Sequence, residues 1–141
     1  MIQRIQTVYL FLGTLGLVAL GLYDMPWSSQ AAATYAWFLP SLIGLIVVTA
    51  GGAIWALFLY HTRKTQRTVV VGVQVGTILL AGVLYGGLYV TGELAFGTGQ
   101  GIEWGRTTVL VLPIVSYVLF YLARRGIDHD IQLVESMDRL R

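Results

Sequence analysis

The fold of this chain is decided by residues 69–92, which read VVVGVQVGTILLAGVLYGGLYVTG and contain no Asp, Glu, Lys, Arg or His. A membrane-spanning helix needs about 20 mostly apolar residues to cross roughly 30 Å of hydrocarbon. Because lipid offers no water to the backbone, the peptide groups of such a segment must bond to one another, as they do in a helix. The sequence therefore predicts a membrane-spanning helix over residues 69–92.

Three further stretches are long and apolar enough to be spans, namely residues 5–23, 36–60 and 107–123. The composition agrees, because only 11% of the 141 residues are charged, whereas an average soluble domain is roughly a quarter charged. The chain has no cysteine, which excludes disulfides, thiolate zinc sites and thiol nucleophiles. We expect an all-α, integral membrane four-helix bundle that forms a single domain over residues 1–141.

The distribution of Lys and Arg predicts the direction of the spans, because cytoplasmic loops carry the excess of basic residues. Of the nine Lys and Arg residues, only Arg106 falls on one side of the predicted membrane. The other eight fall on the opposite side: Arg4, Arg63, Lys64, Arg67, Arg124, Arg125, Arg139 and Arg141. We therefore predict that both termini are cytoplasmic. A cleaved secretory signal is the alternative for the first span, but its apolar run is longer than the core of a normal signal.

A face of small residues on the third predicted span is expected to pack closely against another helix. The face consists of four glycines: Gly72, Gly76, Gly82 and Gly86. At 100° per residue these glycines fall within a face about 120° wide, and helix association in lipid depends on close backbone approach at such faces. Gly52 and Ala56 make a similar patch on the second span. The face either packs inside the chain, or it docks a second copy or a different membrane protein.

The sequence shows no catalytic, cofactor-binding or metal-binding constellation. The predicted spans contain no ionisable side chain apart from tyrosine, whereas transporters and proton relays depend on ionisable groups within the membrane. Glu93, at the end of the third span, is interpreted as a hydrated charge at a helix end. Adjacent residues cannot all point one way, so Asp128-His129-Asp130 is interpreted as a solvated turn or helix surface. The glycine-rich residues 97–101 are expected to be a flexible connector.

The tail, residues 124–141, is expected to form a short amphipathic helix that emerges from the fourth span. Four apolar residues recur in it at helical spacing: Ile127, Ile131, Val134 and Met137. This helix either lies on the membrane surface or docks on a cytoplasmic partner. Its balanced charge is a poor match for anionic lipid, which attracts polybasic segments, and this favours a protein contact.

The two ends of the chain resemble those of a family of small four-span bacterial membrane proteins. The opening MIQRIQTVYL and the closing Leu133-Val134, Ser136 and Asp138-Arg139-Leu140-Arg141 are similar to the ends of the domain-of-unknown-function family four-two-nine-three. The resemblance implies a four-span protein of the bacterial cytoplasmic (inner) membrane with no assigned activity. Asp128 and Glu135 depart from the pattern of the family, which implies basic residues at these positions.

The predicted topology brings both ends of the chain to one face of the membrane. We expect the two ends to share one cytoplasmic surface that includes these residues: Arg4, Gln6, Asp138, Arg139, Leu140 and Arg141. The alternative is that the ends merely cap and anchor their helices.

The sequence is most consistent with a non-catalytic accessory or structural subunit that packs against a larger respiratory, secretion or transport complex. Its expected partners are membrane lipid and other membrane protein subunits, with no cofactor. No nucleic-acid partner is expected, because the basic residues are those that topology already requires. A small four-span transporter or channel that acts as a homo-oligomer is the alternative, and a membrane enzyme is the least favoured function.

Overall fold

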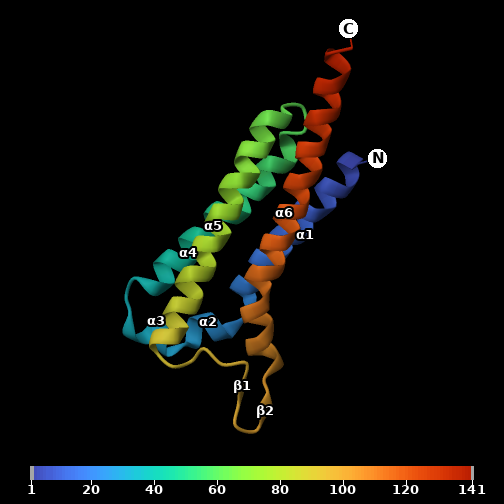
Figure 1. Ribbon diagram of the computed structural model, residues 1–141. Helices are drawn as coiled ribbons and strands as arrows, with labels where there is room; N and C mark the ends of the chain where they lie inside the picture. The colour runs from blue at the N-terminus through green and yellow to red at the C-terminus, as the bar shows by residue number, and fades with distance from the viewer. Residues whose placement is uncertain (1, 141) are drawn as a thin grey trace.

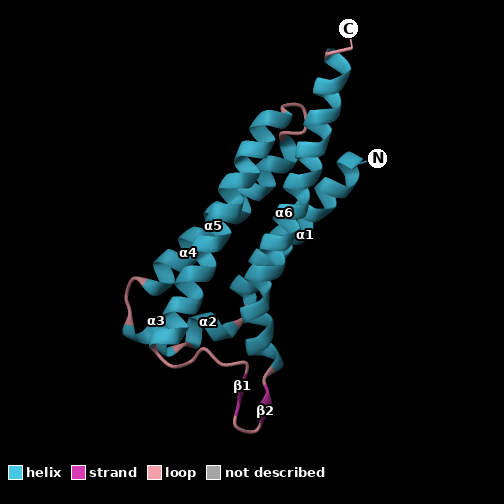
Figure 2. Ribbon diagram, in the orientation of Figure 1, coloured by secondary structure: helices cyan, strands magenta, loops and turns pink. Residues whose placement is uncertain are grey.

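The computed structural model describes residues 2–140, without the side chains of residues 2–4 and 98. Four long helices dominate it (Figure 2): α1 (Ile2–Leu22), α4 (Phe38–Phe58), α5 (Arg63–Val90) and α6 (Trp104–Asp138). Two short helices, α2 (Asp24–Ser28) and α3 (Gln30–Thr34), and a small hairpin of β1 (Gly97–Thr98) and β2 (Gly101–Ile102) complete the described chain. All four long helices contain an apolar window of membrane-spanning length, which confirms the predicted all-α class and its four helices.

The long helices form a bundle in which each one contacts two neighbours. α1 packs against α4 and α6, and α5 packs against the same two helices from the other side. α1 begins and α6 ends at the same end of the bundle, and the hairpin marks the opposite end (Figure 1). The predicted even number of passes therefore places the two chain ends together.

The bundle is apolar both inside and outside. Its centre holds fully buried side chains such as Phe38, Leu84 and Phe120. Large apolar side chains also cover the outer surface, where Val48 is 70% exposed and Phe58 is 72% exposed. A helix that is apolar all round is typical of a membrane span, because its outer face is solvated by lipid.

Two helices extend well beyond the predicted spans. α5 starts at Arg63 rather than at residue 69, and α6 continues to Asp138 without a break after residue 123. The predicted tail is thus the last part of α6 and not a separate helix on the membrane surface. At 1.5 Å per residue, the 35 residues of α6 span about 52 Å, which exceeds the hydrocarbon thickness by roughly 22 Å.

Pro113 lies inside α6, and the helix continues through it. A proline removes one backbone donor and displaces the carbonyls of the preceding turn, so neighbouring groups must satisfy those carbonyls in lipid. The Tyr85 hydroxyl of α5 donates to the carbonyl of Leu110 at 2.5 Å. This bond joins α5 to α6 one turn before the proline.

Only one glycine of the predicted face, Gly76, packs closely against a neighbouring helix. A Cβ at Gly76 would collide with the Thr49 methyl group, whereas one at Gly72, Gly82 or Gly86 would meet no described atom within 4 Å. All three glycines are exposed, and Gly72 lines a groove of about 470 Å³ between α4 and α5, together with Thr49, Gly52 and Trp55. No neighbouring helix therefore fills the space beside these three glycines. Their role in docking another protein stays a prediction.

Other tight glycine contacts join α1 to α6. A Cβ at Gly13 would meet the ring of Phe120, and one at Gly16 would meet the Ser116 hydroxyl. On α5, it is Gly87 that receives a buried ring, that of Phe38. On α4, the predicted Gly52 lies against Val73 and the predicted Ala56 is fully buried.

The end of the bundle that carries the hairpin is closed by ordered connections. The Trp27 indole donates to the carbonyl of Gly21 at 3.0 Å, and the Ser29 hydroxyl caps α3 by accepting from the Ala32 amide at 3.2 Å. Residues 97–102 form an antiparallel hairpin instead of the predicted flexible connector. Gly101 has a φ of +143°, a conformation that residues with a side chain rarely adopt.

Candidate functional site at the basic end of the bundle

Most charged side chains lie at the end of the bundle where α1 begins and α6 ends. We call this region the basic end and define it by residues 5–9 of α1, residues 59–68 and residues 124–140. Three segments that are far apart in the sequence meet there (Figure 1). The basic end therefore concentrates the polar contacts of an otherwise apolar molecule.

A buried hydrogen bond between Gln6 and Asp130 ties α1 to α6. The Gln6 side-chain amide donates to Asp130 Oδ2 at 2.9 Å, and the two residues are 5% and 7% exposed. A buried carboxylate needs such a donor, because losing water without a replacement bond is costly. The interpretation of residues 128–130 as a solvated surface is therefore wrong for Asp130. A small cavity of about 30 Å³ beside this pair is also lined by Tyr60, Arg63 and Gln66.

Helical phase could have revealed this pair from the sequence. Gln6 precedes the buried Leu10 by four residues, and Asp130 follows the buried Ile127 by three. Both polar side chains therefore lie on the inner faces of their helices. The apolar stripe of the tail alone gave no indication of the buried carboxylate.

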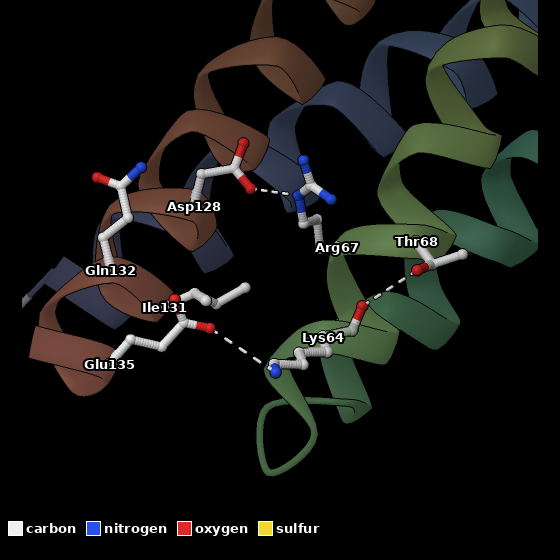
Figure 3. A pocket seen from close by; sticks show the side chains of 7 residues that line it. All are labelled: Lys64, Arg67, Thr68, Asp128, Ile131, Gln132 and Glu135. Atoms are coloured by element: carbon white, nitrogen blue, oxygen red, sulfur yellow. Dashed lines mark hydrogen bonds and ion pairs between the residues drawn. The ribbon is translucent and has the colours of Figure 1, made fainter. Parts of the chain in front are cut away.

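Ion pairs join α5 to α6 in the same region (Figure 3). Asp128 accepts from Arg67, and its other oxygen lies 3.7 Å from Arg124 Nε. Glu135 lies 3.7 Å from Lys64 Nζ. Asp128 and Glu135 are the two residues that depart from the basic pattern that the family resemblance implies, and here they serve as the acidic partners of α5.

Glutamines add two further links at this end. Gln66 donates to the carbonyl of Ala56 at 3.0 Å and so closes the turn between α4 and α5. Deeper in the bundle, Arg124 donates to Gln74 Oε1 at 3.4 Å. Gln74 is only 4% exposed, and its side-chain nitrogen has no partner among residues 2–140. The apolar patterning of the spans gave no indication of these contacts.

The last turns of α6 project beyond the rest of the bundle. Leu133, Val134, Met137 and Leu140 are all exposed, with Leu140 at 89%. Gln6 bonds to Asp130, which lies two turns before Asp138 in α6. The surface that Gln6 is expected to share with Asp138, Arg139 and Leu140 stays a prediction. The side chain of Arg4 and the whole of Arg141 lie outside the described part of the chain.

Two grooves flank the projecting helix. One, of about 440 Å³, runs along the side of the bundle between the first turns of α5 and α6 (Figure 3); it is lined by Lys64, Arg67, Thr68, Asp128, Ile131, Gln132 and Glu135. The other, of about 650 Å³, lies over the start of α5 and reaches Val134 and Asp138. Both combine charges of opposite sign with an apolar wall.

Glu93 and Arg106 lie at the hairpin end of the bundle, far from His61 at the basic end. The Glu93 carboxylate accepts from the backbone N–H of Gln30 at 2.7 Å. The Arg106 guanidinium donates to the Glu93 carbonyl at 3.0 Å. At the basic end, the exposed His61 ring lies 4.0 Å from that of Tyr60. Within residues 2–140, no group of three or more His, Cys, Asp or Glu side chains could hold a metal ion.

Comparison with known proteins gives a family but no activity. No curated protein and no solved structure is significantly similar to the chain. Residues 24–140, well over half of the chain, match the family described as Domain of unknown function (DUF4293). With its membrane-length helices and the matched region covering α2 through α6, this chain belongs to the DUF4293 family.

Proposed function

We propose that this protein is a non-catalytic accessory subunit of a larger membrane complex and that it binds its partner through the projecting end of α6. The protein would lie in a bacterial cytoplasmic membrane, with the basic end in the cytoplasm. Eight of its nine Lys and Arg residues lie at that end or next to it in the sequence, and the positive-inside rule favours such an orientation.

The observation that carries the proposal is the exposed apolar face of α6 beyond the bundle. Leu133, Val134 and Met137 are 44%, 44% and 64% exposed, although they lie past the part of α6 that a membrane would cover. Apolar side chains that cluster on a surface in water are typical of protein interfaces. The polar face of the same helix carries Gln132 and Ser136, so the exposed apolar residues are confined to one side.

Comparative purification in a mild detergent tests this proposal. We expect the unmodified chain to co-purify in a fixed stoichiometry with a larger membrane complex, and the double variant V134E/M137E to lose it. The matched control Q132E/S136E adds the same charge to the opposite face and should retain the complex. Because all four residues are exposed, both variants should fold as the native chain does.

Two outcomes would contradict the accessory role. A native chain that purifies alone, or with further copies of itself only, removes the partner complex and supports a homo-oligomeric transporter or channel. A V134E/M137E variant that keeps the complex as well as the control does would show that the projecting face is not the interface.

A further inference from the structure

We propose that the side groove between α5 and α6 binds the headgroup of a phospholipid that carries both a phosphate and a primary ammonium group, as phosphatidylethanolamine does. This binding site is independent of the accessory role, because the groove lies beside the bundle and not on the projecting face. The proposal rests on the depth of the groove, on its charges and on the apolar surface beneath it.

The groove lies at the level of lipid headgroups. The apolar part of α5 begins at Val69, so Arg67 stands about 3 Å before it. The apolar part of α6 ends at Ala123, and Asp128 follows about 7.5 Å later. The headgroup region adds roughly 5–8 Å to each side of the hydrocarbon core. Arg67 and Asp128 therefore face each other where phosphates and their substituents lie.

The charges of the groove match a zwitterion. Lys64 and Arg67 on α5 oppose Glu135 and Asp128 on α6 (Figure 3). The contact of Arg67 with Asp128 uses only its Nε, and Figure 3 shows both terminal nitrogens directed away from that carboxylate. These nitrogens can bind phosphate in a bidentate manner, which suits arginine.

The carboxylates of Asp128 and Glu135 determine which group attached to the phosphate the groove should prefer. An anionic headgroup with no positive charge would be repelled by Asp128 and Glu135, whereas a primary ammonium can donate to either carboxylate. A trimethylated ammonium has the same charge but no N–H group. The groove is therefore expected to prefer an ethanolamine headgroup to a choline headgroup.

Exposed apolar side chains continue from the groove toward the hydrocarbon. Val75 and Ile78 follow Arg67 by 8 and 11 residues, and Tyr121 and Val118 precede Asp128 by 7 and 10. Each is about half exposed, between 48% and 54%. These spacings place them on the same sides of α5 and α6 as the charged residues. Acyl chains of the bound lipid would lie along this surface.

Native mass spectrometry of the full chain released from bilayers of defined composition tests the proposal. The bilayers contain equal parts of phosphatidylethanolamine, phosphatidylcholine and phosphatidylglycerol with identical acyl chains. We expect the ethanolamine lipid to be retained over the other two by roughly a factor of five. Equal retention of the ethanolamine and choline lipids, or preferential retention of phosphatidylglycerol, overturns the proposal without the need for any variant.

Substitutions then locate the site. D128N/E135Q should lower retention of the ethanolamine lipid to the level of the choline lipid. The control D24N/D138N also removes two negative charges, but outside this groove, and it should leave the retention of the ethanolamine lipid unchanged. If D128N/E135Q unfolds, R67K removes the bidentate phosphate contact and should lower retention of both the ethanolamine and the choline lipids. Unchanged lipid selectivity in a folded D128N/E135Q variant places the lipid elsewhere and overturns the proposal.

Discussion

Individual polar residues at the basic end connect helices that are distant in the chain. Gln6 and Asp130 are 124 positions apart, yet they share a buried hydrogen bond of 2.9 Å. Gly126 lies one turn before Asp130, and the Gln6 side chain occupies the space that a Cβ at Gly126 would need. Gly126 leaves space for the Gln6 side chain, and Asp130 accepts its hydrogen bond. Together the two contacts specify how α1 and α6 are aligned.

Removal of the amide from this pair should destabilise the bundle. In Q6L the Asp130 carboxylate stays buried without its donor, and the loss is expected to be about 2 kcal/mol of unfolding free energy. Thermal unfolding in detergent, followed by circular dichroism, measures the change. The exposed Q132L variant is the control and should shift stability by less than about 0.5 kcal/mol. Equal midpoints for Q6L and Q132L would show that the buried bond contributes little.

A small residue allows two helices to approach closely only if it lies on the side of its helix that faces the neighbour. On α5, a Cβ at Gly76 would collide with Thr49 of α4, whereas one at the exposed Gly82 or Gly86 would meet no described atom within 4 Å. An apolar pattern in a membrane helix cannot distinguish these sides, because lipid and protein interiors are equally apolar. Contacts with neighbouring helices decide which glycine is needed for close approach.

Leucine substitutions at Gly76 and Gly82 of α5 should therefore differ in their effect on stability. G76L places a large side chain against Thr49 and is expected to cost about 3 kcal/mol or to prevent folding, since an overpacked contact has no room to relax. A Cβ at the exposed Gly82 would meet no described atom within 4 Å, so G82L should give a stable, folded protein. Detergent stability and the yield of monodisperse protein measure both variants.

The G82L variant also tests the alternative role of the outer glycines. A folded G82L protein that loses a partner or a second copy would show that this face docks another chain. Failure of G82L to fold would instead contradict the positions of these glycines on the outer side of α5.

The whole molecule is polarised along its long axis. The basic end carries the buried carboxylate, the ion pairs between α5 and α6 and the projecting helix. The opposite end carries α2, α3, the hairpin and only one of the nine basic residues, Arg106. Such an asymmetry in Lys and Arg specifies the orientation of short-loop membrane proteins.

Cysteine labelling should establish this orientation without a background reaction, because the native chain has no cysteine. In intact spheroplasts, a membrane-impermeant maleimide is expected to label Q100C in the hairpin but not S136C near the end of α6. After lysis both positions should react, since both are exposed. Labelling of S136C before lysis would reverse the proposed orientation, and labelling at both positions would contradict the four-span topology.

The sequence by itself determined the all-α class, the number of long helices and the placement of the start of α1 and the end of α6 at the same end of the bundle. These properties depend on the length of apolar runs and on the positions of charges, and both can be read residue by residue. The resemblance of the chain ends also identified the family, which the match over residues 24–140 confirms.

The tertiary structure alone decided which side of each helix faces a neighbour. It showed that Gly13, Gly16 and Gly87 receive neighbouring side chains while Gly82 and Gly86 meet none. It also placed Asp130 against Gln6 and joined the tail to α6 without a break. The physical reason is that lipid removes the contrast between an apolar inside and a polar outside, so the side that packs is set by contacts between distant residues rather than by local composition.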